Sequence, residues 1–181
     1  FNYVNGTLTI TKAVLTVTAD DKSRVYGAAN PAFTISYAGF LNGDTQADLT
    51  TAPTAASTAI ATTGVGTVPI TASGGADDNY SFNYVNGTLT ITKAVLTVTA
   101  DDKSRVYGAA NPAFTISYSG FLNGDNSTDL TSEPTASSTA GATTNVGTVP
   151  ITVSGGADDN YSFNYVSGTL TITKAVLTVT A

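Results

Sequence analysis

The feature that most constrains this chain is a 14-residue stretch that occurs three times at one spacing. The complete central copy spans residues 87–100, and identical copies span residues 6–19 and 168–181. The spacing is the same between successive copies, without insertions. A solenoid rung measures about 20 to 50 residues, so a period of about 80 residues indicates a whole small domain. The sequence predicts a tandem array of such domains.

The apolar residues of this stretch change sides at Lys93. Before it, Leu89 and Ile91 alternate with threonines, whereas after it Leu96 and Val98 occupy the opposite parity. Alternate side chains of a strand point to opposite faces, so the change of parity moves the buried face to the other side. We interpret Lys93 as the seam at which the last strand of one domain continues into the first strand of the next.

The repeat defines four segments. Residues 12–92 and 93–173 are two complete units, and they differ at 11 aligned positions. Residues 1–11 are interpreted as the C-terminal hairpin of a preceding repeat, and residues 174–181 as the first strand of a following one. Two units this similar must share one fold.

Composition removes several classes of function. The chain has no Cys and no His, which excludes thiol chemistry, Cys-type zinc sites and the usual acid–base group at neutral pH. Only 11% of residues are charged, and the net charge of −6 disfavours nucleic acid and anionic membrane as partners. No apolar run approaches the length of roughly 18 residues that a membrane-spanning helix needs, so we expect no membrane insertion in this segment. We expect no catalytic residues, no bound cofactor and no enzyme activity.

Short alternating segments separated by turn residues predict the fold. They are residues 13–19, 33–37, 68–72 and 80–92. With no sustained 3.6-residue period, this pattern predicts an all-β, Ig-like β-sandwich of about seven strands in each unit. Pro69 indicates that its strand lies at a sheet edge. The alternative is a β-grasp-like sheet with one short helical turn, capped by Asp44.

The end of each unit carries a hairpin signal. Asn86-Gly87 separates two alternating segments, and a type I′ turn requires positive φ at both central residues. In that register Tyr84 faces Leu89, and the large apolar residues share one face. The sequence therefore predicts an antiparallel hairpin over residues 80–92.

Candidate binding residues are few. Calcium is the metal considered, because the paired carboxylates Asp77, Asp78, Asp158 and Asp159 supply hard oxygen ligands in loops. The competing interpretation is that these residues cap local backbone in turns. Two further alternatives are a covalent crosslink from a seam lysine such as Lys12, and sugar stacking on Tyr26 or Tyr37 and their equivalents.

An ordered set of short motifs carries a family resemblance. In the second unit these motifs are Val106-Tyr107-Gly108, Asn111-Pro112, Gly120-Phe121, Gly124-Asp125, Val146-Gly147, Asn160-Tyr161 and Gly168-Thr169-Leu170-Thr171-Ile172. Together they resemble the MBG domain of the YGX type, a mostly-β, glycine-rich repeat of large bacterial surface proteins. The resemblance covers both complete units and the partial ends. It implies an extracellular, adhesin-like protein on the bacterial cell surface, and it brings no catalytic residues.

The predicted function is a structural repeat of a long surface adhesin or extracellular filament, acting as a semi-rigid stalk or spacer. The alternative is a repeated module that binds a carbohydrate or protein ligand and gains avidity by copy number. A lone hairpin is only marginally stable in water. We therefore expect residues 1–11 to be covered by neighbouring repeats or by other copies of the chain in a homo-oligomeric fibre.

Overall fold

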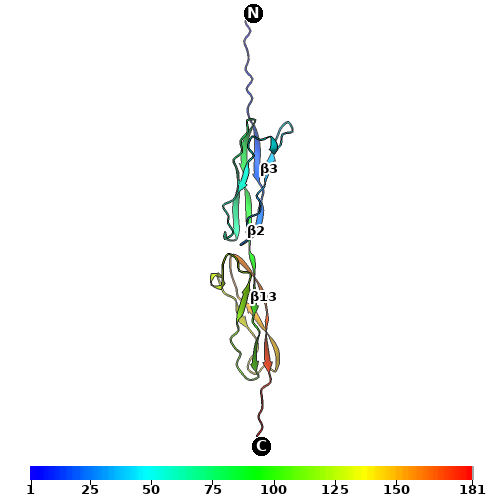
Figure 1. Ribbon diagram of the computed structural model, residues 1–181, viewed down its shortest axis with the longest axis vertical. Helices are drawn as coiled ribbons and strands as arrows, with labels where there is room; N and C mark the ends of the chain where they lie inside the picture. Colours follow the sequence, from blue (N-terminus) through cyan, green and yellow to red (C-terminus); the bar gives the residue numbers. More distant parts are fainter. Residues whose placement is uncertain (181) are drawn as a thin grey trace. The chain divides into compact units, whose positions relative to one another are not determined.

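The computed structural model describes residues 1–180 and divides the chain into two compact units. Unit 1 comprises Phe1–Arg24, Ala28–Ala61 and Gly66–Ile91, and unit 2 comprises Val25–Gly27, Thr62–Val65 and Thr92–Ala181. Most of unit 1 is coloured blue to green in Figure 1, and most of unit 2 green to red. Residues 1–12 and 174–180 form no helix or strand, and Ala181 lies outside the described residues. Their assignment to neighbouring repeats stays a prediction.

Seven strands in two sheets lie in unit 1, except that the last residues of β2 and β7, Val25 and Thr92, fall in unit 2. They are β1 (Ala13–Ala19), β2 (Lys22–Val25), β3 (Ile35–Ala38), β4 (Thr54–Ala56), β5 (Gly66–Ser73), β6 (Tyr80–Val85) and β7 (Gly87–Thr92). One sheet has the order β3-β1-β6 and the other the order β2-β7-β5-β4. A short 3-10 helix, η1 (Gln46–Asp48), precedes β4.

Unit 2 repeats this arrangement. Its elements are β8 (Ala94–Ala100), β9 (Lys103–Val106), β10 (Ile116–Ser119), η2 (Ser127–Asp129), β11 (Thr135–Ser137), β12 (Gly147–Ser154), β13 (Tyr161–Val166) and β14 (Gly168–Thr173). The sheet orders are β10-β8-β13 and β11-β12-β14-β9. The predicted all-β fold of about seven strands per unit is confirmed.

Each core lies where the apolar faces of the two sheets meet. In unit 1, Leu15, Val17, Ile70, Leu89 and Ile91 are at most 1% exposed and come from both sheets. Burying one such side chain stabilises the fold by about 1.5–3 kcal/mol. The buried positions are odd-numbered in β7 and even-numbered in β8, so the change of parity at the seam is confirmed.

The predicted hairpin over residues 80–92 is wrong. β6 pairs in parallel with β1, and β7 lies in the other sheet, antiparallel to β5. The chain therefore crosses between sheets at residue 86, and neither Asn86 nor Gly87 has a positive φ. The parallel pair of β1 and β6 needs a long crossover connection, and no tight turn pairs β6 with β7.

Close backbone approach, and not turn geometry, explains the glycine at this crossing. A Cβ placed on Gly87 would lie 2.3 Å from the carbonyl oxygen of Ala19. Ser167 replaces Asn86 in unit 2 without a change of strand pairing. The Asn-Gly pair that does adopt positive φ is Asn42 (55°) and Gly43 (85°), in a turn closed by a hydrogen bond from Asp44 N to Leu41 O.

Two smaller predictions are refined. Pro69 lies in an interior strand, but β4 pairs only with Thr71–Ser73, so β5 has a single neighbour at Pro69. The helical turn is present as η1, yet its N-cap is Thr45, which forms a capping box with Asp48, and not Asp44. None of the helical segments within residues 1–180 is long and apolar enough to cross a membrane.

Candidate functional site

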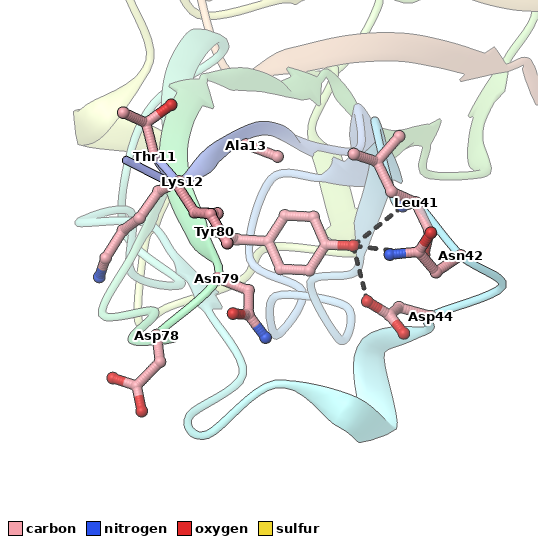
Figure 2. Close-up of a pocket in the computed structure, with 10 residues that line it drawn as sticks. Thr11, Lys12, Ala13, Leu41, Asn42, Asp44, Asp78, Asn79 and Tyr80 are labelled. Atoms are coloured by element: carbon pink, nitrogen blue, oxygen red, sulfur yellow. Dashed lines mark hydrogen bonds between the residues drawn. The ribbon is translucent and has the colours of Figure 1, made fainter. Parts of the chain in front are cut away.

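An open pocket of about 620 Å³ in unit 1 is a candidate site (Figure 2). The entry to β1, the start of β6 and the loop after β3 line it together. Its lining includes Lys12, Leu41, Asn42, Asp44, Asn79 and Tyr80. We call it the Tyr80 pocket. Sequence reasoning missed it, because its parts are far apart in the chain, with Asp44 and Tyr80 separated by 36 residues.

Tyr80 organises the pocket. Its hydroxyl donates to Asp44 Oδ2 at 2.7 Å and accepts from the backbone N–H of Leu41 at 2.9 Å (Figure 2). The Phe40 ring meets the Tyr80 ring edge to face, with centroids 5.6 Å apart. The turn at Asn42-Gly43 places Leu41 and Asp44 on either side of this hydroxyl. The result is a carboxylate held by a hydrogen bond to the tyrosine hydroxyl among the residues that line the pocket.

The electrostatics keep this tyrosine protonated. The N–H of Leu41 lowers the pKa of Tyr80, but burial and the Asp44 carboxylate together raise it above its usual value. In unit 2 burial is the main cause that raises the pKa of Tyr161, to about 12. A hydroxyl protonated at neutral pH serves as a hydrogen-bond donor and not as a general base. The arrangement is suited to holding a ligand by hydrogen bonds.

Unit 2 contains the same cluster with one further side chain in place. Tyr161 donates to Asp125 Oδ2 at 2.8 Å and accepts from the N–H of Leu122 at 2.9 Å. Tyr26, which belongs to unit 2, also donates to Asp125 Oδ2, at 3.0 Å. Its ring meets the Tyr161 ring edge to face, with centroids 5.6 Å apart. The carboxylate therefore accepts two tyrosine hydroxyls.

The backbone around Tyr26 fits closely as well. Tyr26 N donates to Thr92 O at 2.9 Å. Gly27 has a φ of +80°, and a Cβ there would lie 2.7 Å from Leu122 Cδ1. Tyr26 is 5% exposed, whereas Tyr107, its equivalent in sequence, is 43% exposed. Burial of this kind does not suit Tyr26 to sugar stacking.

Two of the four calcium candidates, Asp77 and Asp158, accept hydrogen bonds from backbone N–H groups. Asp77 Oδ1 accepts from the N–H groups of Asn79 at 2.8 Å and Tyr80 at 3.1 Å, and its Oδ2 accepts from Thr50 N at 3.2 Å. The Asn79 N–H is the largest cause of the lowered pKa of Asp77. Asp158 binds the equivalent backbone in unit 2. These hydrogen bonds stabilise the loop that precedes Tyr80 in unit 1 and the loop that precedes Tyr161 in unit 2.

The remaining calcium candidates and the seam lysines do not form a metal site among the described residues. Asp78 and Asp159 are exposed. Within residues 1–180 no group of three or more carboxylates is placed to hold a metal ion. Lys12 Nζ and Lys93 Nζ donate to the carbonyl oxygens of Asp77 and Asp158 at 2.6 and 2.7 Å. The expectation that these loops hold no metal, with calcium as the alternative, stays a prediction.

Sequence reasoning also missed a buried arginine. Arg24, 7% exposed, donates from Nε to Asn30 Oδ1 at 2.8 Å and from Nη2 to Ile60 O at 2.6 Å. Asn30 in turn donates to Ala59 O at 2.6 Å. No local pattern distinguishes this arginine from a solvated strand residue, because its carbonyl partner lies 36 residues away. It anchors two loops of unit 1.

Paired seven-strand units, each built from two facing sheets, define a tandem β-repeat protein. The chain belongs to the MBG domain (YGX type) family, whose sequence model matches residues 15–90 and 96–171. The resemblance drawn from the motifs is thus confirmed. MBG repeat domains are not an enzyme family. A comparison with curated proteins finds no match to the chain.

Proposed function

We propose that this chain is a structural repeat segment of a long bacterial surface adhesin or extracellular filament, in which it acts as a semi-rigid stalk or spacer. One observation carries the proposal: β7 ends at Thr92 and β8 begins at Ala94, so Lys93 alone separates them. A connection of one residue has little conformational freedom compared with a flexible linker of many residues. Such a connection restricts bending between successive repeats, so each added repeat lengthens the stalk.

The surroundings of the chain follow from this role. Its location would be extracellular, on the bacterial surface, and its partners would be neighbouring repeats and other copies of the chain in a fibre. The membership in the MBG family and the regular repeat of the sequence support this assignment. We further propose that the units fold without a bound cofactor, because the loop aspartates Asp77 and Asp158 already accept backbone hydrogen bonds.

Small-angle scattering of the full chain tests the stalk role. A variant with twelve Gly/Ser residues inserted after Lys93 should show a broader distribution of interatomic distances than the parent. An equal insertion between Ala142 and Thr143 controls for added length, because it falls in the loop before β12. If the parent chain and the Lys93 insertion variant sample the same range of shapes, the one-residue connection does not restrict bending and the stalk role is wrong.

A ligand-binding role is the second candidate, and one aromatic pair favours it. The rings of Phe82 and Tyr84 are nearly parallel at 10°, with centroids 6.0 Å apart, and Tyr84 is 37% exposed. Phe163 and Tyr165 repeat the pair in unit 2. Exposed aromatic faces are suited to stacking on apolar faces of sugars. Binding to a glycan array that is lost in the Tyr84→Ala/Tyr165→Ala variant would support this role, and an absence of binding by the parent chain would oppose it.

A further inference from the structure

The two units differ in the hydrogen bonds that reach the aspartate of this cluster, despite their near identity in sequence. In unit 2, Asp125 Oδ2 accepts the hydroxyls of both Tyr161 and Tyr26. In the Tyr80 pocket of unit 1, the hydrogen bond to the side chain of Asp44 comes from Tyr80 (Figure 2).

The rest of the two clusters matches closely. The tyrosine hydroxyl lies 2.7 Å from the carboxylate in unit 1 and 2.8 Å in unit 2, and the leucine N–H lies 2.9 Å from the hydroxyl in both. Within residues 1–180, unit 1 thus has the receiving groups of unit 2 without the incoming tyrosine.

We propose that the Tyr80 pocket binds the Tyr-Gly loop of another MBG repeat, and that the occupant is Tyr107-Gly108 of a second copy of this chain. The incoming hydroxyl donates to Asp44 Oδ2, and the incoming ring meets the Tyr80 ring edge to face. The glycine packs against Leu41, which is 53% exposed. Unit 2 shows each of these contacts between its own residues.

The proposed occupant is available and has the required sequence. Residues 105–110 are identical to residues 24–29, which include Tyr26 and Gly27. Tyr107 is 43% exposed, and nothing among the described residues lies within 4 Å of a Cβ placed on Gly108. Gly108 has a φ of +86°, close to the +80° of Gly27, so this glycine already has the left-handed backbone conformation of Gly27. Binding therefore requires little ordering of the loop.

The chemistry of the pocket favours this occupant over a small solute. A tyrosine hydroxyl is a neutral donor, and a carboxylate accepts from it in a charge-assisted hydrogen bond. Aromatic rings meeting edge to face add about 0.5–1.5 kcal/mol beyond area burial. The side chain of any other residue in place of Gly108 would have to displace Leu41. The pocket therefore selects the Tyr-Gly pair.

Nuclear magnetic resonance of the full chain, labelled with ¹⁵N, tests the proposal. We add a peptide of residues 105–110 and follow the amide signals of Leu41 and Asp44. These signals should shift with saturation, while those of Leu122 and Asp125 stay fixed because their site is filled. A peptide with Phe in place of Tyr107 should bind at least about tenfold more weakly, since a hydrogen bond to a charged group is lost. This change is made in the peptide, so it cannot affect folding.

Two outcomes would overturn the proposal: no shift at Leu41 and Asp44 in millimolar peptide, or equal binding of both peptides. In the chain without peptide, the same two signals should move with protein concentration, and the Tyr107→Ala variant should abolish that dependence. The inference rests on the proposed stalk role, which supplies further repeats as partners. The titration nevertheless reports docking alone, whereas scattering reports bending alone, so failure of one is distinguishable from failure of the other.

Discussion

Replacing the crossing glycine of each unit by alanine should destabilise the fold strongly. A Cβ on Gly87 would lie 2.3 Å from Ala19 O and 2.9 Å from Ala19 C, and one on Gly168 would lie 2.4 Å from Ala100 O. Ordinary contact begins at 3.4 Å, so the backbone must move by about 1 Å. Overpacking costs about 1–3 kcal/mol, and a backbone neighbour that cannot rotate away places this case at about 3 kcal/mol per unit.

The assay is thermal unfolding of the full chain followed by circular dichroism. For a domain of about 80 residues, each kcal/mol lowers the Tm by about 4–8 °C, so the Gly87→Ala/Gly168→Ala variant should melt at least about 12 °C below the parent. Gly6→Ala is the matched control, because its local sequence is the same and nothing lies within 4 Å of the new Cβ.

Asn86→Ala separates the two explanations of this glycine. A type I′ hairpin would need positive φ at Asn86, and alanine there would be costly. In the observed crossing Asn86 is exposed and its φ is not positive, so the variant should melt within about 2 °C of the parent. If Asn86→Ala lowers the Tm as much as Gly87→Ala, the close-approach reasoning is refuted.

Three further predictions concern the buried arginine, the loop carboxylates and metal. Arg24→Lys should cost about 2–4 kcal/mol in chemical unfolding, because one ammonium cannot replace the forked contacts to Asn30 and Ile60, whereas Lys22→Arg should cost less than about 0.5 kcal/mol. Folding lowers the pKa of Asp77, so the stabilisation that this carboxylate gives the fold is present above pH 3.8, its unfolded pKa, and is lost as pH falls through the folded pKa. The Asp77→Asn variant should therefore show a smaller loss of unfolding free energy at acidic pH than the parent. Adding a chelator should shift the Tm by less than about 1 °C. A calcium site at a free calcium concentration of about a hundred times its Kd would instead add about 2.7 kcal/mol to the free energy of unfolding, and the chelator would remove that stabilisation.

Much of the fold could be predicted from the order of residues alone. Strand alternation is a local property, so the sides of Leu89 and Leu96, and the change of parity at Lys93, could be assigned without a structure. The same holds for the turn at Asn42-Gly43, where the residues themselves favour positive φ. Strand pairing could not be predicted in this way. Asn86-Gly87 has the signal of a hairpin, but the chain crosses to another sheet at that point.

The sequence by itself determined the repeat, the all-β class and the family, because each depends on spacing and identity along the chain. Only the tertiary structure decided which strands pair, why Gly87 is needed, and that Asp44 meets Tyr80. Those features depend on groups that are distant in sequence, as Asp44 and Tyr80 are. Local preferences cannot choose among distant partners. Which strands pair depends on burying the apolar faces of the two sheets against each other, and that involves the whole unit.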